Sequence, residues 1–236
     1  MKKQNTLAAF GFLCLLTACH PEAKPPAAVE THATVAPDLA APLDLSTNYT
    51  TPLSRFDHIT QFPAWKTVPR GQQVFAGVPL DIEGMICLWG EGNTTKLKIV
   101  FPEARLDIPI NRKFETLYVY HGSFFTSPDG TPVCAVVFRY VDGSSATNRM
   151  LYGTDMLDWV ANAGEPVIGP TGPHSKLAWV GGSFSTTQKK PLRLCLTAIE
   201  NPQPSLEVKN IDLYSLKSRT APCIMAMTPG KSGLLQ

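Results

Sequence analysis

Residues 116–152, TLYVYHGSFFTSPDGTPVCAVVFRYVDGSSATNRMLY, decide the fold class. Three runs rich in Val, Tyr and Phe (Thr116–Phe125, Val133–Val141 and Arg149–Tyr152) are separated by Asp129-Gly130 and Asp142-Gly143. An Asp-Gly dipeptide between apolar runs is typical of a β-hairpin, because glycine accepts the positive φ of a tight turn. The stretch therefore predicts three strands in an antiparallel meander.

The same alternation of short apolar runs and turn residues continues from about residue 71 to residue 229. Val, Ile, Tyr and Phe in such runs fit pleated, half-buried strands, and the repeated blade motif of a β-propeller is missing. The pattern predicts an all-β fold, an antiparallel β-sandwich or barrel, with one short helix over 154–162 capped by Thr154 or Asp155. The other predicted strands are Gln73–Val78, Met85–Trp89, Lys96–Phe101, Arg105–Pro109, Lys176–Val180, Pro191–Ile199, Val208–Ser215 and Ile224–Met227.

Residues 1–18 have the organisation of a bacterial secretion signal. Lys2 and Lys3 precede the apolar segment Leu7–Leu16, which is shorter than the roughly 20 residues of a bilayer-spanning helix. The following Leu16-Thr17-Ala18-Cys19 matches the lipobox, in which the cysteine thiol receives diacylglycerol. The alternative is an ordinary cleaved signal with an incidental cysteine. The order of the three parts favours a lipoprotein, with Cys19 acylated (palmitate or a similar chain) and held on a membrane.

Removing this signal changes the charge of the protein. The full chain has 21 basic and 19 acidic residues, and loss of Lys2 and Lys3 leaves 19 of each. A chain without basic excess is a poor ligand for phosphate backbones, so nucleic acid is not an expected partner. His20 follows the lipidated cysteine, and by resemblance to enterobacterial sorting this favours the outer membrane of the cell envelope.

The segment that follows Cys19 predicts a tether. Residues 19–70 are rich in Pro, Ala and Thr, and the part up to Pro42 cannot bury enough side-chain surface to order itself. Residues 43–70 are open to two readings, because Phe56, Ile59, Phe62 and Trp65 have a crude helical spacing and would allow docking onto the domain. The predicted domains are therefore this tether, a sandwich over 71–229 and a tail over 230–236.

Four cysteines remain within the domain: Cys87, Cys134, Cys195 and Cys223. No CxxC pair occurs, so a zinc site is poorly supported. An exported protein meets an oxidising compartment, where these four are candidates for disulfides in any pairing. The alternative is that each is a small apolar core residue, since all four lie in strand-like runs.

Several segments, in this order, resemble the galactose-binding-domain-like jelly rolls found beside bacterial glycoside hydrolases and in envelope proteins. The resemblance implies a jelly-roll sandwich that binds carbohydrate or contacts a larger envelope assembly, usually without catalysis of its own. It also implies a structural calcium ion in many members, but the acids show no calcium-loop spacing that would assign ligands, and no other cofactor is predicted. The segments are Phe75–Ile82, Leu117–His121, Arg139–Gly143, Tyr152–Asp155 with Asp158-Trp159, Ala178-Trp179, Asn201–Pro204, Val208–Leu213 and Ala226–Thr228.

Sugar recognition needs a flat apolar surface for the ring and polar groups for its hydroxyls. Trp89 and Trp179 adjoin polar or glycine-rich loops, and Asp155, Asp158 and Trp159 form the most distinctive polar cluster. The alternative is structural, with the tryptophans in the core and Asp155 capping the short helix. The candidate ligand-binding residues are Trp89, Asn148, Arg149, Asp155, Asp158, Trp159 and Trp179.

An enzyme is less well supported. The chain contains no GxSxG, HExxH or P-loop motif, and His121 on an apolar strand suits a structural histidine. A glycan hydrolase would need two carboxylates about 5–10 Å apart, for which the candidates are Asp142, Asp155, Asp158 and Glu165. The leading expectation is a non-catalytic carbohydrate-binding lipoprotein; an assembly lipoprotein that docks an envelope protein is the alternative.

Overall fold

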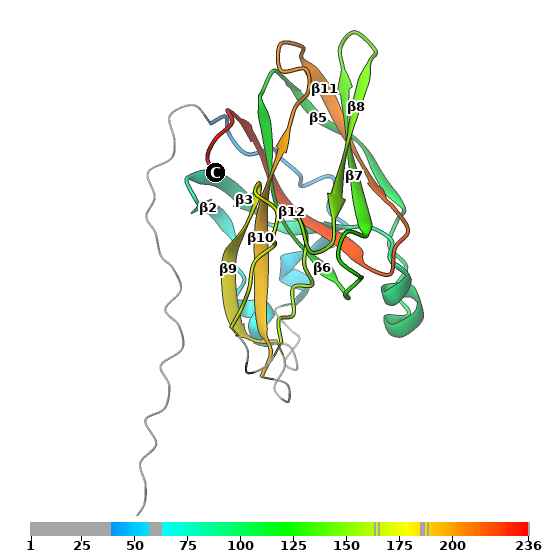
Figure 1. The fold of residues 1–236 in the computed structure, drawn as a ribbon, viewed down its shortest axis with the longest axis vertical. Helices are drawn as coiled ribbons and strands as arrows, with labels where there is room; N and C mark the ends of the chain where they lie inside the picture. The colour runs from blue at the N-terminus through cyan, green and yellow to red at the C-terminus, as the bar shows by residue number, and fades with distance from the viewer. Residues whose placement is uncertain are drawn as a thin grey trace, which may run out of the picture.

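The computed structural model describes residues 39–56, 63–162, 164, 166–184, 187 and 189–235. Twelve strands in these residues form a six-stranded sheet, a four-stranded sheet and a separate two-stranded hairpin (Figure 1). All the strand pairs are antiparallel, so the predicted all-β sandwich is confirmed. The jelly-roll subtype stays a prediction.

The six-stranded sheet has the order β1-β4-β12-β6-β10-β9, and the four-stranded sheet has the order β5-β11-β7-β8. The first consists of β1 (Thr51–Pro52), β4 (Gly84–Cys87), β12 (Ala221–Gly230), β6 (Thr116–Phe124), β10 (Pro191–Glu200) and β9 (Ser175–Ser183). The second consists of β5 (Ala104–Arg112), β11 (Val208–Ser215), β7 (Pro132–Tyr140) and β8 (Ser145–Leu151). The remaining elements are the hairpin strands β2 (Gly71–Phe75) and β3 (Val78–Ile82) and the short helices η1 (Leu53–Phe56), η2 (Pro63–Thr67) and η3 (Asn93–Leu97).

One of the two predicted hairpins is confirmed. Asp142-Gly143 joins β7 to β8, and Gly143 has the positive φ of 87° that such a turn requires. The prediction at Asp129-Gly130 is wrong, because β6 and β7 lie in different sheets. β6 is already paired with β12 on one side and β10 on the other, and Gly130 N–H instead donates to the carbonyl of Tyr152 (2.8 Å).

The predicted helix at 154–162 is absent. β6 and β10 pair with each other as far as His121 and Cys195, and past that point residues 158–161 lie between the two strands. Trp159 N–H donates to the carbonyl of Ser123 on β6, and Arg193 N–H on β10 donates to the carbonyl of Trp159. Backbone groups used in this way are not available for a helix. The predicted strand Lys96–Phe101 is also wrong, because η3 occupies its first residues.

Apolar side chains form two cores. The first lies between the two sheets, where Val119 of β6 meets Val136 and Phe138 of β7. The second lies on the outer face of the six-stranded sheet, where Tyr118 and Tyr120 of the same β6 strand point. The hairpin β2–β3, helix η2 and the C-terminal residues pack on this second core, which closes that face of the sandwich.

The packed unit begins earlier than residue 71. Leu43 and Leu45 are 4% and 1% exposed within the first core, and Leu43 N–H donates to the carbonyl of Met227 (2.8 Å). Trp65 is buried in the second core. Residues 39–56 and 63–70 of the predicted tether therefore belong to the domain, whereas the predicted signal, Cys19 and the rest of the tether lie outside the described residues. No helix in the described part of the chain is long and apolar enough to cross a membrane.

Two of the four domain cysteines are joined. Cys87 of β4 and Cys223 of β12 are directly opposite each other, with Cα atoms 4.1 Å apart, and form a disulfide. Cys134 and Cys195 are free thiols in fully buried positions, where burial raises the pKa of each to about 12. For these two cysteines the alternative prediction is confirmed, because they are small apolar residues of the core.

Candidate functional site

The outer face of the four-stranded sheet presents a regular grid of mostly polar side chains, with the buried apolar Ala135 and Val137 on its middle strand. Successive side chains of a strand point to opposite faces of the sheet. Val136 and Phe138 of β7 point into the core, so the residues between and beside them on β7, and their partners on β8 and β11, point outward. With about 4.8 Å between strands and about 6.6 Å between alternate residues, the grid covers roughly 10 by 13 Å. Its rows, from β8 through β7 to β11, are Arg149–Ala135–Tyr214, Thr147–Val137–Asp212 and Ser145–Arg139–Asn210.

Asp212 organises this grid. Its side chain is only 7% exposed, although it lies on the outer face. Arg139 Nε donates to Asp212 Oδ2 (2.8 Å), and the backbone N–H of Asp107 donates to Oδ1 (2.9 Å). The Tyr214 hydroxyl lies 3.4 Å from Oδ2 and 3.5 Å from Arg139 Nη2. The hydrogen bond to Asp212 raises the pKa of Arg139, and the network holds the guanidinium beside the phenol ring.

The chemistry of this grid suits an uncharged polar ligand. Arg139 and Arg149 are exposed and balance the charges of Asp212 and its neighbour Asp107. Tyr214 is half-buried and supplies an aromatic ring, while Asn210 and Thr147 add donors and acceptors. An aromatic face bordered by hydrogen-bonding groups is what a sugar ring with several hydroxyls requires.

This face is also open, unlike that of the other sheet. Within the described residues, η2 packs on β9 and β3 packs on β12, whereas no helix or strand packs in this way on the outer face of the four-stranded sheet. The side chains of Arg139, Thr147 and Arg149 on this face are exposed, as expected for a face that no helix or strand covers.

The three predicted tryptophans are spread over the molecule. Trp159 is 2% exposed, with its ring edge-on to Trp65 (centroids 4.6 Å apart) and Phe124 (3.9 Å), so it is a core residue. Trp89 and Trp179 are half-buried. Trp179 is on β9 and Trp89 lies two residues after the end of β4, and three strands of the sheet separate β4 from β9. The tryptophans therefore do not form a shared platform.

The two predicted aspartates hold the chain together. Asp155 Oδ2 accepts from the backbone N–H of Leu151 (2.8 Å), and its carbonyl accepts from Thr197 Oγ1 (3.1 Å). Asp158 Oδ1 accepts from the N–H of Val160 (2.9 Å). Burial raises the pKa of Asp155 and raises that of Asp158 to about 6. Both carboxylates thus have structural partners.

Of the other two predicted residues, one lies on the grid. Arg149 pairs with Ala135 and points outward, whereas Asn148 pairs with Val136 and belongs to the inner face of β8. The seven predicted ligand-binding residues are therefore not brought together. The network residues Arg139, Asp212 and Tyr214 were missed, although the alternation of Asn210, Asp212 and Tyr214 with Ile211 and Leu213 is a usable signal for an outward-facing polar row.

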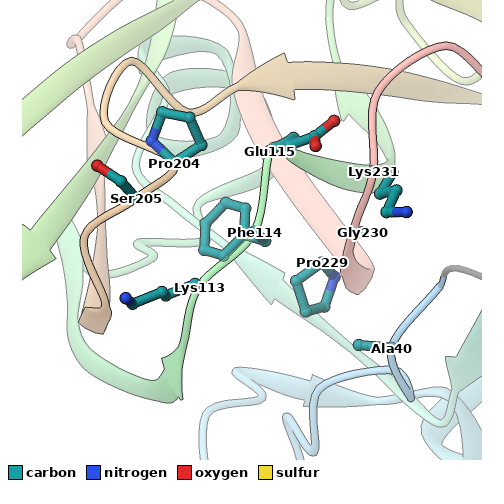
Figure 2. Close-up of a pocket in the computed structure, with 9 residues that line it drawn as sticks. All are labelled: Ala40, Lys113, Phe114, Glu115, Pro204, Ser205, Pro229, Gly230 and Lys231. Carbon is teal, nitrogen blue, oxygen red and sulfur yellow. The ribbon is translucent and has the colours of Figure 1, made fainter.

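A separate hollow of about 540 Å³ opens at one end of the sandwich (Figure 2). Its apolar lining includes Phe114, which is 6% exposed and packs edge-on against Phe138. Glu115 Oε2 accepts from both the backbone N–H and the hydroxyl of Ser232, so this carboxylate joins two chain segments. The hollow is a second candidate surface. It is lined by Ala40, Lys113, Phe114, Glu115, Pro204, Ser205, Pro229, Gly230 and Lys231.

Asp142 and Asp155 are too far apart to be the two carboxylates of a hydrolase. Asp142 precedes β8 and Asp155 follows it, and the seven residues of β8 span about 23 Å. That is well beyond the separation of about 5–10 Å in glycosidases. Glu165 lies outside the described residues. No group of three or more His, Cys, Asp or Glu residues in the described ranges is arranged to hold a metal ion.

Comparison with models of known protein families and with curated proteins gives no match for this chain.

Proposed function

We propose that this protein is a lipid-anchored, non-catalytic carbohydrate-binding protein of the bacterial envelope, and that the outer face of the four-stranded sheet binds the glycan. The observation that carries the proposal is the buried Asp212 carboxylate, which fixes Arg139 and Tyr214 side by side on an open face. Fixing these groups before the ligand arrives reduces the entropy lost on binding.

The location is argued from the N-terminus. The basic start, the short apolar segment and the lipobox ending at Cys19 favour export and lipidation, with the outer membrane as the proposed destination. The Cys87–Cys223 disulfide supports export, because such bonds persist in oxidising compartments. Labelled palmitate should enter the wild-type protein and not a Cys19→Ala variant in a bacterial host; equal labelling of the two would contradict the anchor.

Binding can be tested with the mature chain from His20 onward, titrated with soluble cell-wall and plant polysaccharides. Tyr214→Ala should weaken binding about tenfold or more, because it removes the aromatic contact, whereas Tyr214→Phe keeps the ring and should lose less. Lys66→Ala is the matched control, since Lys66 is exposed on η2, over the other sheet. Failure to bind any glycan at millimolar concentration, or equal binding by Tyr214→Ala, would overturn the proposal.

A further inference from the structure

The loop between β4 and β5, together with the start of β5, holds most of the large exposed apolar side chains among the described residues. Single exposed apolar residues are normal on a soluble surface, but clusters mark interaction sites. Six large apolar side chains are exposed in the described residues, and four of them fall between positions 97 and 106. These four are Leu97 (45% exposed), Ile99 (43%), Val100 (71%) and Leu106 (49%).

The loop is a structured projection. At its base, Gly92 N–H donates to the carbonyl of Arg219 (3.0 Å) and Trp89 N–H donates to that of Pro102 (2.8 Å). Helix η3 begins at the fully buried Asn93 and ends at Leu97, and the φ of 57° at the following Lys98 turns the chain back. Figure 1 shows this helix standing out from the sandwich at the lower right. The apolar side chains are therefore held outward by the backbone.

The charges at the tip are basic. Lys96 and Lys98 are exposed on either side of Leu97. The acidic residues lie toward the base of the loop, where Glu103 is paired with Lys217 (2.9 Å). A bilayer with anionic headgroups attracts exposed aliphatic residues that alternate with lysines. The aliphatic side chains enter the boundary of the acyl chains, while the ammonium groups remain among the headgroups.

A protein partner fits this tip less well. Protein interfaces are enriched in Tyr, Trp, Phe, Met and Arg and depleted in Lys. Residues 96–100, Lys-Leu-Lys-Ile-Val, have none of the enriched types and two of the depleted one. The composition therefore favours lipid over protein as the occupant.

We propose that residues 96–100 insert into the interfacial region of a bilayer that contains anionic lipid, as a second membrane contact beside the proposed anchor. The contact does not depend on glycan binding. The twenty residues from Cys19 to Asp38 span at most about 70 Å, so a chain held at Cys19 has the reach to bring this loop to the same membrane.

Co-sedimentation with protein-free vesicles tests the proposal. The mature chain from His20, which lacks both the apolar signal and Cys19, is mixed with phosphatidylethanolamine vesicles with and without phosphatidylglycerol. One variant combines Ile99→Ser with Val100→Ser, and a second combines Lys96→Gln with Lys98→Gln. The matched control combines Val141→Ser with Ile168→Ser, which removes the other two exposed apolar side chains. Thermal unfolding of each variant verifies that the fold is retained.

The wild type should bind the phosphatidylglycerol vesicles, and Ile99→Ser with Val100→Ser should weaken this binding about tenfold or more, because two large side chains no longer enter the lipid. Lys96→Gln with Lys98→Gln should remove the preference for phosphatidylglycerol, and the control should bind like the wild type. Absence of wild-type binding, or equal losses in the tip and control variants, would overturn the proposal. Binding only to bacterial envelope vesicles that retain their proteins would also overturn it, in favour of a protein partner.

Discussion

The disulfide between β4 and β12 should contribute substantially to stability. Cys87 and Cys223 are 136 residues apart in sequence, and closing a loop of that length in the unfolded chain is worth roughly 5 kcal/mol at 25 °C in the chain-entropy treatment. Measured losses on removing a native disulfide are about 2–5 kcal/mol. For a domain of this size, that corresponds to a fall in Tm of roughly 5–20 °C.

Urea unfolding of two double variants isolates this contribution. Cys87→Ala with Cys223→Ala removes two buried sulfur atoms and the cross-link. Cys134→Ala with Cys195→Ala removes two buried sulfur atoms alone, at a cost on the order of 1 kcal/mol each. The first variant should be less stable than the second by about 2–4 kcal/mol. Equal stability of the two variants would contradict a stabilising disulfide, as would four thiols that react with maleimide in the unfolded, unreduced chain from His20.

Four further predictions concern three buried polar groups and one close backbone contact. Burial lowers the pKa of His121 to about 3 from 6.5, so its contribution to stability is lost as the pH falls from 6.5 toward 3, and His121→Gln should reduce that loss in urea midpoints measured across this range. Asp158 acts in the opposite direction, because its pKa is about 6 in the folded protein and 3.8 in the unfolded chain. Its contribution to stability is lost as the pH rises from 3.8 through 6, and Asp158→Asn should reduce that loss. For either variant, a pH dependence of stability equal to that of the wild type would contradict the shifted pKa. Asp212→Asn should lower the free energy of unfolding by about 1–3 kcal/mol in urea, because the amide replaces a charged acceptor shared by two donors; no loss would contradict its role. Gly90→Ala should destabilise by about 1–3 kcal/mol, since a Cβ there would meet the backbone of β12 at 2.6 Å, whereas Gly182→Ala, with open space around it, should not; equal effects would contradict the contact.

The β-strands of the sandwich can be predicted from the sequence because they depend on local patterns of residues. Alternating side chains and the Asp142-Gly143 turn predict β7 and β8 directly. The Asp129-Gly130 prediction is wrong for a non-local reason: both sides of β6 are already paired with strands much later in the chain, β10 and β12. Sequence spacing says nothing about which sheet a strand joins when its partners are distant.

The residues of the candidate site were harder to predict. The residue type of Trp159 predicts a platform for a sugar ring. Residues 158–161 lie between β6 and β10, however, and this position buries the Trp159 ring in the second core. Asp155 and Asp158 were singled out as a polar cluster, but each accepts a nearby backbone N–H. The grid residues Arg139 and Tyr214 are in different strands, 75 positions apart, and only the register of β7 on β11 brings them together.

Backbone-amide NMR can locate the glycan on the protein, through the shifts that a bound oligosaccharide causes in the isotope-labelled chain from His20. The perturbed amides should lie in β5, β7, β8 and β11 and include those of Arg139 and Tyr214. Perturbations confined to the hollow in Figure 2, at residues 113–115 and 229–231, would contradict it, because they would place the ligand at the end of the sandwich instead of on the open sheet.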